Sequence, residues 1–180
     1  MTACWLVAIS AVVSVATGPT QLLMFKPIRR NGGASIVAFE FAGSWERARS
    51  IMAAWGDQGQ TAMRRTLWLD FAFLAGYGTL GATVAHVTAG HADHRGWPNY
   101  AHVATGAMIA FIVAAALDAI EDVALFAVLR NSGHGPAPTI ARHAARAKFT
   151  LLLAAIIVTA GVATLFLAAT HCPSHVSKPC

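Results

Sequence analysis

The chain has 180 residues, of which 56% are hydrophobic and only 12% are charged. A charged fraction so far below the roughly 25% of soluble domains excludes an ordinary water-soluble protein and indicates a single transmembrane domain over residues 1–180. A formal charge of +5 would suggest a nucleic-acid partner in a soluble chain, but no nucleic-acid motif accompanies it. We therefore expect the lipid bilayer to be the main partner and expect no nucleic acid.

The first apolar segment covers about residues 3–25. No basic residue precedes the apolar run, so we interpret it as a retained membrane span and not as a cleaved signal peptide. Gly18 and Pro19 lie inside this segment. Proline has no backbone N–H and clashes with the preceding turn, so we expect the helix to kink or to end early there.

A segment of mixed polarity follows, and its residues 44–55 predict an amphipathic helix at the membrane surface. Ser44 has the side chain of an N-cap residue. Trp45 and Trp55 are expected to be shielded at the bilayer interface, which indole rings favour. The glycine-rich residues 56–59 predict a turn that ends this helix.

The second predicted span covers about residues 66–87 and contains Asp70, with Tyr77 seven residues later on nearly the same helix face. Three glycines in this span would weaken a helix in water, but in a bilayer small residues allow two helices to approach closely. We therefore predict a tight helix contact at Gly76, Gly78 and Gly81.

Residues 88–100 predict a short polar link, and the third and fourth spans are expected at about 101–129 and 149–170, separated by a turn-rich loop at 131–138. Each apolar segment is about as long as the ~20 residues that cross a bilayer. The predicted fold is thus all-α, an integral membrane, antiparallel four-helix bundle with one interfacial amphipathic helix.

The basic residues are unevenly distributed along the chain. Of thirteen Lys and Arg residues, seven lie in the first link and four in the third, whereas the second link and the tail hold only Arg95 and Lys178. Basic links usually face the cytoplasm. The sequence therefore predicts a multi-pass protein of the plasma membrane with both termini on the extracytoplasmic side.

Three sequence motifs suggest a family. These are FEFAGSWERARSIMAAWG, then LWLDFAFLAGYG, and LDAIED one span later, together covering roughly Phe39 to Asp122. In these motifs the chain resembles a loose group of small bacterial four-span integral membrane proteins without assigned activity. The resemblance implies a four-span topology in a bacterial inner membrane and implies no chemistry.

Four carboxylates are expected in the cytoplasmic half of the bilayer. Asp118, Glu121 and Asp122 occupy positions i, i+3 and i+4 and share one helix face, and Asp70 lies at a similar depth. With Tyr77 they are candidates for binding a proton, a cation, a metal or a lipid head group. The alternative is structural ion pairing, because ionised side chains in hydrocarbon need partners. The candidate basic partners are Arg65, Arg146 and Lys148.

A second set of ionisable residues is expected near the outer face. Histidine is a common ligand of zinc and copper, but loop histidines without a metal role are more common, and we expect less than one tightly bound transition metal per chain. The candidate ligands are His86, His91, His94 and His102. Cys172 and Cys180 are candidates for a disulfide on an oxidising side of the membrane.

No catalytic triad order, nucleotide-binding loop or H-E-x-x-H motif occurs, and we expect no cofactor. Two classes of function remain open. One is a non-enzymatic membrane protein, either an accessory subunit with a protein partner or a second copy, or a transporter-like protein that binds a proton or cation. The other is a membrane enzyme that acts on a lipid or isoprenoid substrate.

Overall fold

The computed structural model describes residues 2–30, 34–130 and 133–171 of the chain. Within these ranges the chain is helical apart from short turns, and no strand occurs, so the predicted all-α class is confirmed. The helices are α1 (Thr2–Arg30), α2 (Ile36–Glu40), α3 (Trp45–His94), α4 (Pro98–Leu129) and α5 (Ala137–His171).

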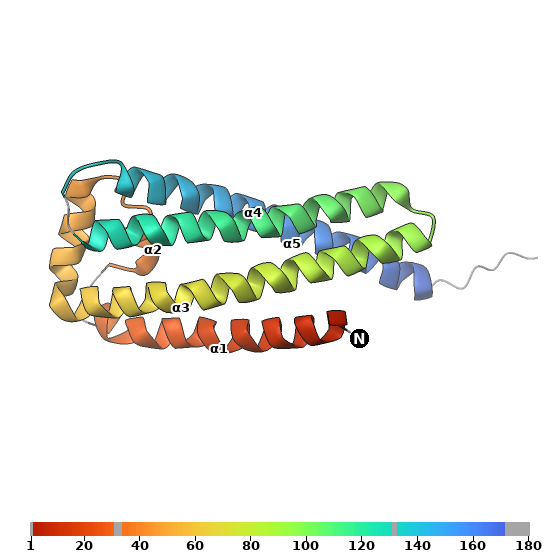
Figure 1. Ribbon diagram of the computed structural model, residues 1–180, viewed down its shortest axis with the longest axis horizontal. Coiled ribbons are helices and arrows are strands. Elements are labelled where there is room, and N and C mark those ends of the chain that lie inside the picture. The colour runs from red at the N-terminus through yellow and green to blue at the C-terminus, as the bar shows by residue number, and fades with distance from the viewer. Residues whose placement is uncertain (1, 31–33, 131–132, 172–180) are drawn as a thin grey trace, which may run out of the picture.

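The long helices run roughly parallel to one axis of the molecule and alternate in direction (Figure 1). Helix α3 packs against α1 on one side and against α4 on the other, and α4 packs against α5. The end of the molecule where α4 ends and α5 begins is called here the basic end. The opposite end, where α3 turns into α4 next to the N-terminus, is called the histidine end.

Three helices are long and apolar enough to cross a membrane: α3, α4 and residues Ala137–Phe166 of α5. Large apolar side chains on these helices point away from the rest of the protein, including Trp68, Val123 and Leu153. Among the residues described, α1 contributes a shorter apolar stretch, Val7–Thr20. Three of the four predicted spans therefore lie within helices of the required length and composition, and the first stays a prediction.

Helix α1 does not end at its proline. It continues through Gly18 and Pro19 to Arg30, so the expected early end is wrong. A proline within a helix removes one backbone hydrogen bond, here the one to the Val15 carbonyl, and packing against a neighbouring helix can compensate for the loss. Helix α1 packs against α3 at this point, since a Cβ atom added at Gly18 would lie 3.6 Å from the Phe73 ring.

The amphipathic helix predicted at 44–55 is the first part of α3 and crosses the basic end of the molecule (Figure 1). The Ser44 side chain caps it by accepting from the backbone N–H of Arg47 over 3.3 Å. Gly56 alone breaks the helix, with φ 60° and ψ −171°, and the helix resumes directly after it. The turn predicted over 56–59 is thus a single residue, because only glycine adopts this backbone conformation easily.

The apolar face of the crossing segment packs on protein. Trp55 is buried against the Phe39 ring of α2, with ring centroids 4.9 Å apart, and its indole N–H donates to the Ala34 carbonyl over 2.8 Å. The Trp45 indole N–H donates to the Gly135 carbonyl over 2.8 Å. Both indoles are therefore partnered by the protein itself, which the sequence pattern of an interfacial helix did not predict.

The predicted tight contact at the three glycines is present between α3 and its neighbours. A Cβ atom added at Gly76 would lie 2.8 Å from the Ser14 hydroxyl, and one added at Gly78 would lie 2.8 Å from the Ala115 Cβ. At Gly81 it would overlap the Phe111 ring. The small residues thus bring α3 close to both α1 and α4, and this close approach positions the acidic residues of α3 and α4.

At the histidine end the predicted link is much shorter than expected. Helix α3 extends to His94 and α4 begins at Pro98, so most of the polar residues of 88–100 are helical. Gly96, with φ 72°, makes the turn. Proline is favourable in the first turn of a helix because its missing N–H would have no partner there.

Candidate functional site

The three acids of α4 are buried inside the protein. Asp118 is 3% exposed, Glu121 is 0% exposed and Asp122 is 1% exposed. Their spacing places them on one face of α4, as the sequence predicts, and the small residue Ala114 continues this face toward the histidine end. Since burying an ionised carboxylate without partners is costly, each acid must be neutralised by a proton or by a nearby cation.

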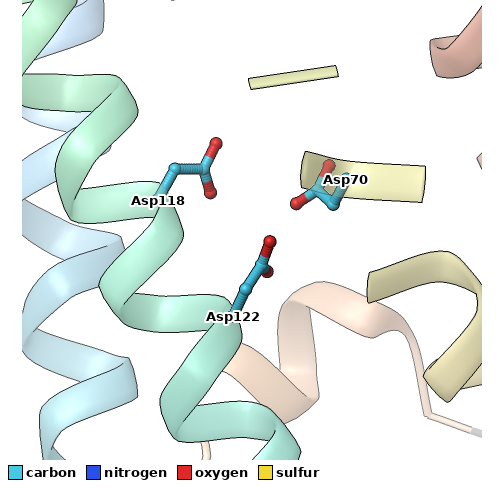
Figure 2. Close-up of side chains that lie close together, drawn as sticks. All are labelled: Asp70, Asp118 and Asp122. Carbon is cyan, nitrogen blue, oxygen red and sulfur yellow. The ribbon is translucent and has the colours of Figure 1, made fainter. Parts of the chain in front are cut away.

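Asp70 of α3 joins two of these acids. One carboxylate oxygen from each of Asp70, Asp118 and Asp122 lies within 4.8 Å of the other two. Figure 2 shows the three carboxylates pointing toward a common centre from two helices. We call these three residues the aspartate triad. In the part of the chain that the structure describes, it is the one group of three such side chains that could hold a metal ion.

Lys148 of α5 supplies a positive charge next to the triad. Its ammonium forms ion pairs with Asp118 and with Glu121, the latter over 2.8 Å. Lys148 is itself buried. The other two predicted basic partners, Arg65 and Arg146, are exposed. Arg146 precedes Lys148 by two residues, which places its side chain on the opposite face of α5.

Asp118 connects three helices. Its Oδ1 accepts a hydrogen bond from Lys148 of α5, and its Oδ2 accepts one from the Tyr77 hydroxyl of α3 over 2.9 Å. Hydrogen bonds to an ionised group are about twice as strong as those between neutral groups. Both donors therefore fix the direction in which the Asp118 carboxylate points.

Other carboxylate oxygens in the same place have no donor. Glu121 Oε1 and Asp122 Oδ2 are buried and accept no hydrogen bond in the structure. The Lys148 ammonium lies near Glu121 Oε2 at ion-pair distance but without hydrogen-bond geometry. A buried polar atom that lacks a partner costs about 1–3 kcal/mol, so such atoms call for a specific explanation.

The sequence analysis missed one acid of this site, Glu40. It is the last residue of α2, a five-residue helix capped by the Ser35 hydroxyl. Its Oε2 is buried without a hydrogen bond. Burial raises the pKa of Glu40 from 4.5 to about 7, the Lys148 charge acts in the opposite direction, and Asp70 and Asp118 add to the increase. In the sequence, the two phenylalanines that flank Glu40 were the feature that indicated its burial.

The buried acids of α4 outnumber the cation that pairs with them. Among the described residues, Lys148 forms ion pairs with Asp118 and Glu121, whereas Asp122 Oδ2 accepts no hydrogen bond. If all three of these carboxyl groups were ionised, they would carry more negative charge than Lys148 compensates, in a poorly hydrated place. Closely spaced carboxylates avoid this by sharing protons or by binding a cation.

An apolar cavity of about 480 Å³ lies between α3, α4 and α5. Tyr77 lines it, so the hydroxyl that contacts Asp118 belongs to a residue at the wall of this cavity. Most other lining residues are apolar, among them Phe111 and Leu152. The volume lies in the range of small-molecule pockets in proteins.

The predicted histidine ligands remain on the surface at the histidine end. His86, His91 and His94 are exposed on α3, and His102 is exposed near the start of α4. The His91 ring nitrogen Nδ1 lies 2.9 Å from the Val87 carbonyl. The cysteines of the predicted disulfide, Cys172 and Cys180, lie outside the described residues.

The predicted resemblance to bacterial four-span membrane proteins stays a prediction, and the chemistry of the site has to be derived from its own residues. Two features provide the basis for this: an excess of buried carboxyl groups and their convergence from different helices. Comparisons with protein-family models, with curated proteins and with solved structures find no match to this chain.

Proposed function

We propose that this chain is an integral membrane protein of four antiparallel spans, capped by the crossing segment of α3. Three helices of sufficient length and the exposed apolar side chains on their outer faces support this proposal. The charge distribution supports an orientation with the basic end in the cytoplasm of a bacterial cell and both termini outside. In this orientation the exposed arginines of the basic end face water.

The buried acids then lie in the cytoplasmic half of the bilayer. Asp118 precedes Arg130 by twelve residues, which corresponds to ~18 Å along α4. Asp70 follows Arg65 by five residues, or ~7.5 Å along α3. Ionisable residues at such depth generally face the protein interior and serve proton or ion pathways.

The proposed function is to hold an exchangeable proton or cation at this cluster, in a non-enzymatic role such as that of a transporter-like protein or an accessory subunit. Within the described residues, the three buried carboxyl groups of α4 exceed the one ammonium that pairs with them, and this excess carries the proposal. A purely structural network would be expected to balance its charges, because uncompensated buried charge is destabilising. A site that takes up protons or cations from solution supplies the missing positive charge reversibly.

A hydrophobic carbodiimide tests this proposal, because it modifies protonated carboxyl groups in apolar surroundings. The purified protein in detergent should be labelled within α3 or α4 at neutral pH, as peptide mass spectrometry would show. Labelling should be weaker in Asp70→Asn and Asp122→Asn, and unchanged in the control Asp93→Asn, which alters an exposed acid. Folded protein with no labelled carboxyl in these helices, and with no cation bound, would contradict the proposal.

The cavity beside Tyr77 favours one alternative, a membrane enzyme acting on a lipid or isoprenoid. An apolar chain could occupy the cavity while a polar group approaches Asp118. Lipids extracted from the purified protein would then be enriched in one class in the wild type. Ala160→Leu, which enlarges a side chain at the cavity wall, should abolish that enrichment.

A further inference from the structure

We infer that the aspartate triad is a binding site for one hard divalent cation, of the class of Mg²⁺, Mn²⁺ or Ca²⁺. This inference rests on the proposed function and narrows it, since it selects a divalent metal ion among the protons and cations that the cluster could hold. Three features of the site support it: the geometry of the triad, the unpartnered oxygen of Asp122 and the groups that hold Asp118 in place.

The spacing of the triad suits a cation of this class. Hard divalent cations bind oxygen at about 2.0–2.6 Å, so two oxygens on opposite sides of such an ion are roughly 4–5 Å apart. The three oxygens of the triad all lie within 4.8 Å of one another. An ion at their centre would therefore lie close to bonding distance from all three oxygens, and small side-chain rotations would complete the contacts without a shift of α3 or α4.

The buried oxygen of Asp122 points to a ligand independently of this spacing. Asp122 is almost completely buried, and its Oδ2 accepts no hydrogen bond. In Figure 2 its carboxylate points toward those of Asp70 and Asp118. Hydrogen-bond donors would normally surround a structural carboxylate in the interior, whereas a metal ligand keeps its oxygen available.

The residues around Asp118 act as supports for a metal ligand. Tyr77 and Lys148 each donate to a different oxygen of Asp118. Every carboxylate oxygen has a second lone pair, so these bonds leave Asp118 able to coordinate an ion. Hydrogen bonds of this kind orient ligands and strengthen metal binding.

The donor set also selects the metal. Three carboxylates from α3 and α4 with no histidine or cysteine among them favour magnesium, calcium or manganese over zinc and copper. The Glu121 carboxylate remains paired with Lys148. One divalent ion would then neutralise most of the charge of the triad while Lys148 compensates Glu121.

Titration of the purified wild-type protein with Mn²⁺, followed by electron paramagnetic resonance of the free ion, tests the site. We expect one Mn²⁺ per chain, displaced by Mg²⁺ or Ca²⁺ but not by an equal concentration of K⁺. Asp122→Asn keeps the size of the side chain and should weaken Mn²⁺ binding ~10-fold or more, on the scale of changes at metal ligands. Glu46→Gln, an exposed acid on the crossing segment, is the matched control and should bind as the wild type does.

Equal Mn²⁺ affinity in the wild type and Asp122→Asn would mean adventitious surface ions only and would overturn the inference. Wild-type protein that the carbodiimide labels but that binds no Mn²⁺ would overturn the divalent site and leave the proposed function standing. Protein that shows neither property would overturn both. If Asp122→Asn fails to fold, protection of the wild-type Asp122 peptide from the carbodiimide by Mn²⁺ decides the question, and absence of protection contradicts the site.

Discussion

The basic end and the histidine end of the molecule both carry many ionisable residues, but they use them differently. Toward the basic end, acids from α2, α3 and α4 are directed inward and meet Lys148 from α5. At the histidine end, His86, His91 and His94 are exposed on successive turns of one helix. Convergence of buried groups from several helices, and not the residue type, therefore distinguishes the candidate site from a polar surface.

The supporting contacts differ in the same way. At the basic end, side chains of the crossing segment bond to the loop between α4 and α5: Arg49 donates to the Gly133 carbonyl over 3.3 Å, and Trp45 donates to Gly135. Arg64 donates to the carbonyl of Leu129 at the end of α4 over 3.1 Å. The basic residues here thus stabilise helix ends, besides setting the membrane orientation that we propose.

The largest effect is expected for Lys148→Met. This change leaves Asp118 and Glu121 buried without their cation, and removal of one partner of a buried ion pair typically costs about 3–5 kcal/mol. Unfolding in detergent, followed by circular dichroism, would measure the loss. The control Arg146→Met changes an exposed cation two residues away and should cost less than about 0.5 kcal/mol. Equal stability of the two variants would contradict the importance of the Lys148 pairs.

The ionisation of Glu40 should be visible in the pH dependence of the free energy of unfolding. The folded protein binds this proton more tightly than the unfolded chain, because the pKa of Glu40 is raised from 4.5 to about 7 by burial. The free energy of unfolding should consequently be highest below pH 4.5, fall by up to ~3 kcal/mol in total as pH rises to about 7, and then level off. Glu40→Gln should remove this part of the pH dependence, whereas Glu46→Gln should retain it. A pH profile that is the same in both variants would show that Glu40 does not titrate in this window.

A smaller effect is expected for Tyr77→Phe, which removes the hydroxyl that donates to Asp118. A hydrogen bond to a charged group contributes about 1.5–3 kcal/mol, and we expect a loss near the lower value because Lys148 still contacts Asp118. Tyr100→Phe at the histidine end is the matched control, since Tyr100 is exposed, and its unfolding should be unchanged. If both variants lost the same stability, the Tyr77 hydroxyl would have no special role.

The smallest effect is expected at the histidine end. His91→Ala combined with His94→Ala should change stability by less than about 0.5 kcal/mol, because both side chains are exposed. Elemental analysis of the purified protein should show less than one zinc or copper per chain, in both the wild type and this variant. Stoichiometric metal in the wild type that is lost in the variant would show that the histidine end also holds a site.

The acidic face of α4 could be predicted from sequence because helix periodicity alone fixes which residues share a face. The sequence could not show that the acids pair with Lys148 and not with Arg65 or Arg146, because this depends on how α5 is rotated against α4. Glu40 was missed because a helix as short as α2 is not stable alone and is positioned by tertiary contacts, including the burial of Phe39.

The full length of α3 could not be predicted from the sequence pattern either. Gly56 and Gly59 both indicate a turn, but only Gly56 adopts a left-handed backbone, and Gly59 is buried within the helix. Polar residues near His94 predicted a loop, yet they continue α3 because a helix end exposed to water tolerates them. The observed ends of the helices therefore differ from the predicted ends by several residues, whereas the apolar centres of the helices lie where they were predicted.

We propose that the buried acids are neutralised by protons or cations taken from solution. Infrared difference spectroscopy of the carbonyl band of protonated carboxyl groups tests it most directly, comparing the wild type with the combined variant Asp70→Asn, Asp118→Asn and Asp122→Asn. We expect a band from at least one protonated, poorly hydrated carboxyl group at neutral pH in the metal-free wild type. It should decrease when Mn²⁺ is added and be reduced in the variant. A folded wild-type protein that shows no such band and binds no cation would contradict the account.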